Sequence, residues 1–256
     1  MLIDVVNVDS YPVELKEVVQ HEVDCCTQEI EDIKNQLTCG TEPVIAFEKQ
    51  YGCNTRYYWY QSTLIPIFCK YDIACYHITK ALDPERFMQT GLYTNDIVRY
   101  CKRLREELHQ CGFVTQEQDY IIDLAQQEYK RKHTSLRIHP LLFFTSGMDT
   151  LKMRYDQFTE NIGGELVRWP LEEHNPEMQT RLRHYGKPCV VKFRLPFKEI
   201  EAHDHYGIVQ QFVYDYLAKC VFNIDYHIAF DAKTSIDIPP EDILEVIPCE
   251  EVKYDE

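Results

Sequence analysis

The residues from 72 to 91 constrain the fold more than any other stretch, because an apolar run stops there and a bounded helix begins. The run covers residues 72–79 and ends in the sequence Tyr-His-Ile-Thr, which includes His77 and Thr79. In a strand, side chains two positions apart point to the same face. We therefore predict a strand whose end presents His77 and Thr79 together.

The helix that follows this strand has clear start and stop signals. Asp83 is suited to cap the helix, Pro84 to occupy its first turn and Gly91 to end it. Apolar periodicity places further elements along the chain. We expect helices over residues 11–37, 96–111, 116–132, 149–161 and 206–221, and strands over 56–68, 141–146, 165–171, 189–197, 222–230 and 235–240.

This order of elements indicates an α+β fold. Strands and helices do not alternate strictly, and no G-x-G-x-x-G follows a strand, which argues against a doubly wound dinucleotide fold. The phosphate-binding sequence G-x-x-x-x-G-K-[ST] and the hydrolase sequence G-x-S-x-G are also missing. We expect an extension over residues 1–70, helical and extended, packed on a core over residues 71–256.

Charge is distributed unevenly along the 256 residues. The net charge of −15 argues against a general nucleic-acid coat protein. Residues 51–197, however, hold 20 bases and 17 acids, while both flanking segments are strongly acidic. The middle contains two basic clusters, at residues 99–105 and 129–137. Each cluster is either a solvated helix face or a phosphate-binding surface, and the acidic ends suit a protein partner.

The cysteines and the N-terminus point to a cytoplasmic location. Eleven cysteines occur without a C-x-x-C pair or metal-ligand spacing, so we expect reduced thiols and no bound metal. The first residues lack the features of a signal peptide, and no apolar run is long enough to span a membrane.

Three short sequences combine into a candidate site. Tyr-His-Ile-Thr ends one expected strand at residues 76–79, and Phe-Phe-Thr-Ser ends another at 143–146. Gly-Gly-Glu-Leu-Val at 163–167 places Glu165 directly after two glycines, which let a ligand approach the backbone. Singly, each sequence is typical of ordinary strand ends and turns, and their order carries the hypothesis.

Together these motifs resemble the ADP-ribosyltransferase superfamily, in particular its histidine-containing branch and bacterial enzymes that modify nucleic acids. The resemblance covers residues 72–247 and includes the strand–helix unit YHITKALDPERFMQTGLY, the strand LLFFTS and the glutamate of GGELVRWPL. It implies a split β-sheet core with inserted helices, and NAD as substrate without a metal.

The resemblance also implies roles for individual residues. Glu165 would be the catalytic residue, and the residues implied in binding NAD are His77, Thr79, Tyr93, Tyr155 and Ser146. Position 163 is glycine, where enzymes that modify arginine carry a second acidic residue. The resemblance therefore disfavours arginine as the target.

The implied function is mono-ADP-ribosyl transfer from NAD to a macromolecule. The basic middle of the chain favours RNA or DNA over protein as the acceptor, and the setting would be a toxin or an antiviral defence effector. Two alternatives stay open, namely an NAD glycohydrolase and a non-catalytic binding or immunity-type protein on the same fold.

Overall fold

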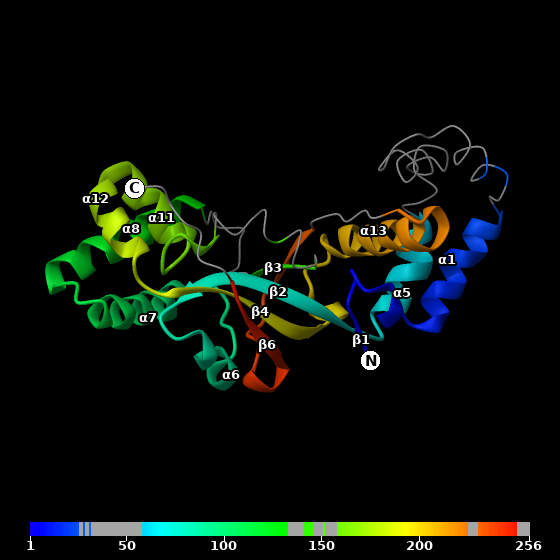
Figure 1. Cartoon of the computed structure of the whole chain (residues 1–256), viewed down its shortest axis with the longest axis horizontal. Helices are drawn as coiled ribbons and strands as arrows, with labels where there is room; N and C mark the ends of the chain where they lie inside the picture. Colours follow the sequence, from blue (N-terminus) through cyan, green and yellow to red (C-terminus); the bar gives the residue numbers. More distant parts are fainter. Residues whose placement is uncertain are drawn as a thin grey trace. The chain divides into compact units, whose positions relative to one another are not determined.

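The computed structural model describes residues 1–25, 28, 31, 58–132, 141–145, 151, 158–224 and 230–249. Within these ranges the chain forms helices and one six-stranded open sheet, which confirms the α+β class (Figure 1). The finer expectation, an ADP-ribosyltransferase-like split sheet, stays a prediction.

The sheet has the strand order β5-β3-β2-β4-β6, and β1 pairs with β2. Its strands are β1 (Leu2–Ile3), β2 (Asp72–Ala81), β3 (Leu141–Phe144), β4 (Lys187–Pro196), β5 (Asp231–Thr234) and β6 (Ile243–Pro248). The β1–β2 pair is parallel and the β4–β6 pair is antiparallel. The expected strands at 72–79, 141–146 and 189–197 are therefore confirmed as β2, β3 and β4.

The chain divides into two compact units. Unit 1 comprises residues 1–75, 144–150 and 194–233, and unit 2 comprises residues 76–143, 151–193 and 234–256. Strands β2 and β4 each contribute residues to both units. The sequence-based boundary between residues 70 and 71 stays a prediction.

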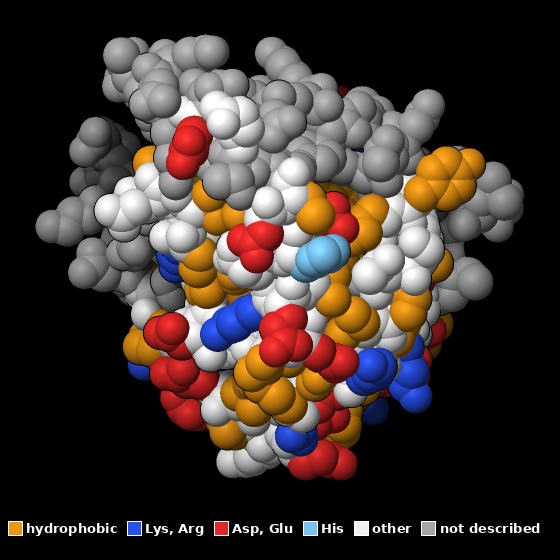
Figure 2. Space-filling model, turned by 90° about the vertical axis from the view of Figure 1, so that its right-hand side faces the viewer, with side chains coloured by type: hydrophobic (Ala, Val, Ile, Leu, Met, Phe, Trp, Pro, Cys, Tyr) orange, Lys and Arg blue, Asp and Glu red, His pale blue; other side chains and the backbone are white. Residues whose placement is uncertain are grey.

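Unit 1 contains α1 (Val13–Cys25), a π-helical turn (Tyr60–Leu64), α5 (Ile65–Phe68), α13 (His205–Tyr216) and a second π-helical turn (Leu217–Phe222). Its core is aromatic, since the ring of Phe68 lies 5.1 Å from those of both Phe197 and Phe212. On the face shown in Figure 2, acidic side chains lie among hydrophobic ones.

The expectation of a strand over residues 56–68 is wrong, because residues 58–68 are helical. Tyr60, Leu64 and Phe68 are fully buried, and their spacing of four places them on one side of a helix. Pro66 lies in the first turn of α5, where its missing N–H costs nothing. Burial of this aromatic face outweighs the β propensity of the sequence.

Unit 2 contains five α-helices among the described residues. They are α6 (Phe87–Thr90), α7 (Ile97–Gln110), α8 (Thr115–Lys132), α11 (Glu165–His174) and α12 (Pro176–Arg183). Helix α8 packs against both α7 and α11, and α11 packs against α12 (Figure 1). Their shared core includes Leu104, Leu108, Ile121, Val167 and Leu171.

Most expected helices are confirmed where the structure describes them. The 96–111 helix is α7, and Asp96 caps it by accepting a 2.8 Å hydrogen bond from the Arg99 N–H. The 116–132 helix is α8, and the 206–221 helix is α13 with its π-helical turn. The 11–37 helix is α1 as far as Cys25, and the 149–161 helix lies largely outside the described residues.

The helix after β2 begins as a 3-10 turn (Pro84–Arg86) and continues as α6. Asp83 precedes it in extended conformation, without a side-chain cap, and Gly91 ends it with φ of +73°. The predicted positions of the start and the stop are therefore confirmed, but the predicted cap is wrong, because the Asp83 side chain accepts no hydrogen bond from the first turn.

The expected strand at 165–171 is wrong, since these residues begin α11. Leu166, Val167, Pro170 and Leu171 are its buried residues, and pairs four positions apart share one side of a helix. In a segment of seven residues this pattern also reads as an apolar run typical of a strand. Glu165 therefore lies in the first turn of a helix.

The C-terminal strand expectations are wrong in position. Phe222 belongs to the π-helical turn, residues 225–229 are not described, and β5 begins at Asp231. In the 235–240 segment, Ile238 forms an isolated antiparallel bridge to Leu92, and β6 begins only at Ile243. Among the described residues, no helix is both long enough and apolar enough to cross a membrane.

Candidate functional site

His77 lies on β2 with its ring half-buried, and its Nδ1 is 2.8 Å from the carbonyl oxygen of Leu142 on β3. A carbonyl oxygen can only accept, so Nδ1 donates its hydrogen. Burial lowers the pKa of His77, and the positive charge of Arg103 lowers it further, against the opposing effect of the Leu142 bond. The neutral ring then has Nε2 free of hydrogen, which makes this nitrogen an acceptor.

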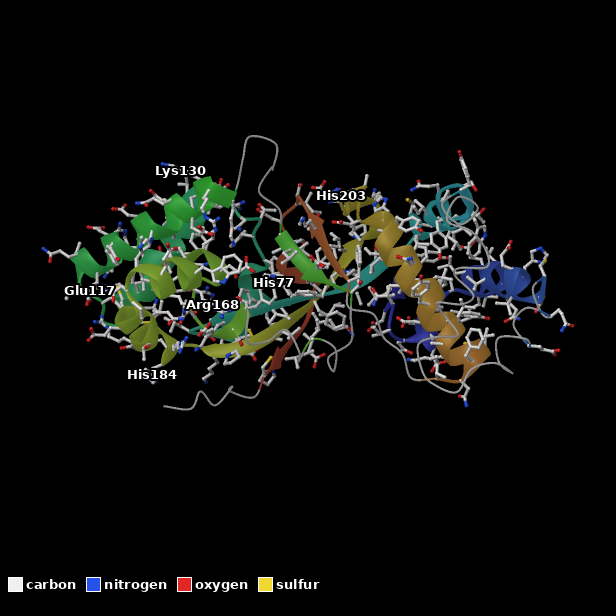
Figure 3. All side chains as sticks on the ribbon, turned by 90° about the horizontal axis from the view of Figure 1, so that it is seen from above. His77, Glu117, Lys130, Arg168, His184 and His203 are labelled. Carbon is white, nitrogen blue, oxygen red and sulfur yellow. The ribbon has the colours of Figure 1, made fainter. Side chains whose placement is uncertain are left out.

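Thr79 is half-buried like His77, whereas Tyr76, Ile78 and Lys80 between and beside them are buried. This alternation confirms that His77 and Thr79 occupy the same face of β2. Figure 3 shows His77 on the strand within unit 2. The arrangement presents one acceptor nitrogen and one hydroxyl group on a single strand face.

Gly91 brings the chain from α6 to Tyr93. A Cβ atom at this position would lie 2.0 Å from the Ile238 carbonyl oxygen, so only glycine permits this approach. Leu92 then exchanges backbone hydrogen bonds of 2.8 and 2.9 Å with Ile238. The bridge fixes the start of the segment that carries Tyr93, whose side chain is 44% exposed.

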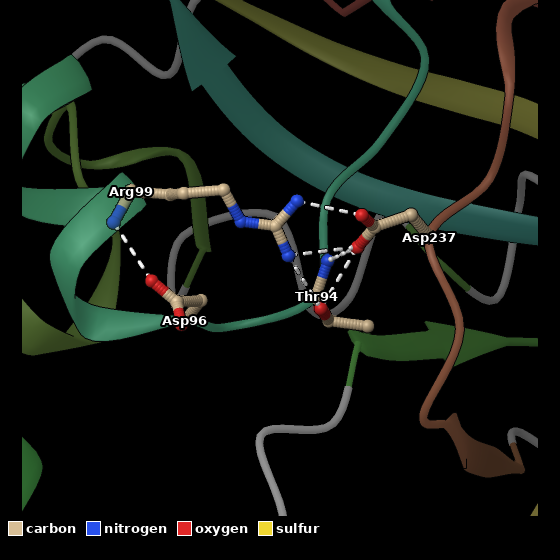
Figure 4. Close-up of polar contacts among 4 residues, drawn as sticks. All are labelled: Thr94, Asp96, Arg99 and Asp237. Atoms are coloured by element: carbon tan, nitrogen blue, oxygen red, sulfur yellow. Dashed lines mark hydrogen bonds and ion pairs between the residues drawn. The ribbon is translucent and has the colours of Figure 1, made fainter.

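A network of polar contacts holds Arg99 close to Tyr93 (Figure 4). Arg99 donates to the two carboxylate oxygens of Asp237 at 2.6 and 3.1 Å, and Thr94 donates to the same carboxylate through its backbone and hydroxyl groups. Burial pushes the pKa of Asp237 upward, but these hydrogen bonds outweigh it and lower the pKa. The guanidinium of Arg99 consequently stays 5.1 Å from the centre of the Tyr93 ring.

Tyr93, Thr94 and Arg99 line a cavity of about 390 Å³, here called the α7 pocket. It lies within unit 2 between α6, the following loop and α7. The lining of the pocket includes Arg86, Tyr93, Arg99, Tyr100, Lys102 and Arg103. Four of these side chains are cationic, and Glu106 is the acidic member of the lining.

The sequence identified the basic cluster at 99–105 but missed its convergence with Arg86 and Tyr93. The sequence did indicate that the basic side chains at positions 99, 102 and 103 share one face of a helix, because positions 102 and 103 follow position 99 by three and four residues. Arg86 comes from a different element and is held by an ion pair with the buried Glu107. That pairing depends on tertiary packing.

Glu165 accepts a hydrogen bond of 2.8 Å from the Lys132 ammonium group at the end of α8. The same ammonium lies 3.6 Å from the ring centre of Trp169, one helical turn after Glu165. The Glu165 side chain is 34% exposed and occupies the helix N-terminus, where the helix dipole favours a negative charge. The carboxylate is thus accessible and paired.

The Gly163-Gly164 turn connects Glu165 to the wall of the α7 pocket. The Tyr100 hydroxyl group donates a 2.7 Å hydrogen bond to the carbonyl oxygen of Gly163. Both glycines have positive φ, and Gly164 directly precedes α11. The turn therefore fixes where α11 starts relative to α7 inside unit 2.

The chain matches no family model, no curated protein and no solved structure. The function is consequently inferred from the geometry of the residues in this chain. The structure brings Tyr93 into the α7 pocket, whereas His77, Thr79 and Glu165 are not among the described residues that line it. Ser146 and Tyr155 lie outside the described residues.

Proposed function

We propose that the chain is an NAD-dependent mono-ADP-ribosyltransferase that modifies a macromolecule. The observation that carries the proposal is that β2 presents His77 and Thr79 on one strand face, shortly before α6. This is the arrangement that the resemblance to ADP-ribosyltransferases implies for the NAD-binding strand and helix.

His77 and Thr79 would contact the sugar of NAD. Because the His77 Nδ1 is occupied by the Leu142 carbonyl, its Nε2 can accept a hydrogen bond from a ribose hydroxyl group. The Thr79 hydroxyl can donate or accept beside it.

Glu165 would stabilise the reacting ribose. Departure of nicotinamide leaves positive charge on the sugar, as in glycoside cleavage, and a fixed carboxylate lowers the energy of that state. In the structure Lys132 neutralises this carboxylate. The lysine bonds Oε2 of this carboxylate, so Oε1 would accept the hydrogen bond from the ribose.

The same ion pair favours a second candidate function, a non-catalytic binding protein. A glutamate in a helix that is paired with a lysine on the neighbouring helix is a common stabilising contact. Under this alternative Glu165 has no chemical role, and its removal leaves every binding activity unchanged.

The experiment is incubation of the purified protein with NAD labelled in its adenylate half, together with RNA, DNA or cell lysate. We expect label on one class of macromolecule, and a loss of about 10²–10³ in rate for Glu165→Gln. Nicotinamide release without label would instead identify an NAD glycohydrolase. A folded protein that leaves NAD intact in every mixture would support the binding protein.

A further inference from the structure

The α7 pocket carries more positive charge than its internal ion pairs use. Arg86 is paired with Glu107, and Arg99 with Asp237. In the part of the chain that the structure describes, Lys102 and Arg103 have no ion-pair partner, although Arg103 lies 6.0 Å from the ring centre of Tyr100. Two cations are thus available to a ligand in a protein of net charge −15.

An aromatic ring lies beside these cations. Tyr93 is 44% exposed, and Arg99 is held near its ring by Asp237 and Thr94. The ring is therefore accessible to a flat group. A stacking surface next to phosphate-binding cations is how proteins hold single-stranded nucleic acid.

The pocket is open rather than enclosed. Tyr93, Arg99, Lys102 and Glu106 on its lining are all exposed. Sites for small ligands usually bury 70–90% or more of the ligand surface. An open site with exposed cations suits an extended strand that passes over the surface.

From these observations we infer that the α7 pocket binds the acceptor as single-stranded nucleic acid. Lys102 and Arg103 contact consecutive backbone phosphates, and Tyr93 stacks on a base, in place of the nicotinamide that the resemblance implies for it. The inference rests on the proposed function, whose acceptor it names.

The test is fluorescence anisotropy of labelled single-stranded RNA and DNA of about 12 nucleotides, a length within the range that such sites cover. It is done without NAD, so that binding is measured independently of turnover. We expect Lys102→Ala/Arg103→Ala to weaken binding about 10-fold or more. The salt dependence of log K should decrease by about 0.7 for each phosphate that the variant no longer neutralises. Tyr93→Leu should weaken binding about 10-fold because the base can no longer stack.

The matched control is Lys130→Ala/Lys187→Ala, which removes the same charge from two exposed lysines that do not line the pocket and that form no ion pair among the described residues. We expect its affinity to stay within about twofold of wild type, as for other surface substitutions. Equal weakening by both double variants would show that binding follows overall charge and would overturn the inference. Circular dichroism confirms that each variant is folded.

A second ligand separates the acceptor from the donor. If Lys102→Ala/Arg103→Ala weakens binding of ADP-ribose and leaves oligonucleotide binding unchanged, the pocket binds the donor and the inference is wrong. Oligonucleotide binding that needs Lys102 and Arg103 in a protein that never consumes NAD would show a nucleic-acid site in the pocket, but it would refute the proposed function and with it the acceptor role. NAD turnover without oligonucleotide binding would support the proposed function and overturn the inference about the pocket.

Discussion

Three influences act on the carboxylate of Glu165. The N-terminus of α11 stabilises its negative charge, the Lys132 ammonium pairs with it, and Trp169 holds that ammonium from the other side. The sequence predicts that Glu165 follows a glycine pair. It could not predict a partner 33 positions earlier, because that contact depends on how α8 packs against α11.

The two glycines before Glu165 should respond differently to substitution. Both have positive φ, so alanine at either costs about 1–2 kcal/mol in backbone strain. A Cβ at Gly163 would also lie 2.7 Å from Val167 Cγ2 and 2.9 Å from the Tyr100 hydroxyl oxygen, whereas Gly164 has open space. Gly164 has φ of 60° and ψ of −146°, close to a backbone region that is essentially restricted to glycine, so we expect Gly164→Ala to lower the free energy of unfolding by about 2 kcal/mol. We expect Gly163→Ala to lower it by about 4 kcal/mol, because overpacking adds to the strain. Urea unfolding measures both, and equal losses would contradict this account of the turn.

At the scale of elements, long periodic segments were predictable and short ones were not. Helices α7 and α8 show helical periodicity over many residues, and β2 and β4 are apolar runs of strand length. The segments at 58–68 and 165–171 are too short for periodicity to separate helix from strand. Their state depends on which face tertiary packing buries.

One buried carboxylate ties α11 to α12. Glu160 is 3% exposed and pairs with Arg168 on α11 and with Arg183 on α12. Removing its charge leaves both guanidinium groups without this partner in a partly buried site. We expect Glu160→Gln to lower the free energy of unfolding by about 3 kcal/mol.

The control for this prediction is Glu172→Gln, because Glu172 is 56% exposed and its carboxylate lies 4.0 Å from Arg168. Exposed pairs contribute little, so its loss should stay below about 1 kcal/mol. Chemical denaturation of both variants provides the comparison. Similar stability of Glu160→Gln and wild type would show that the buried carboxylate is not a structural anchor.

At the scale of the whole molecule, the sequence was sufficient for the α+β class and for the basic cluster at 99–105. It could not predict the α7 pocket, because Arg86, Tyr93 and α7 are brought together only by tertiary structure. The division into two units was equally hidden, since unit 1 combines three separate stretches of chain. Local sequence patterns contain no information on such distant associations.

If Glu165 assists cleavage of NAD, the rate of nicotinamide release depends on its carboxylate. The rate is measured for wild type, for Glu165→Gln and for the control Glu172→Gln on the same helix, whose side chain is exposed. We expect release by wild type and by Glu172→Gln, and a rate about 10²–10³ lower for Glu165→Gln. Equal rates for Glu165→Gln and wild type, or no release by the folded wild-type protein with any acceptor, would contradict this expectation.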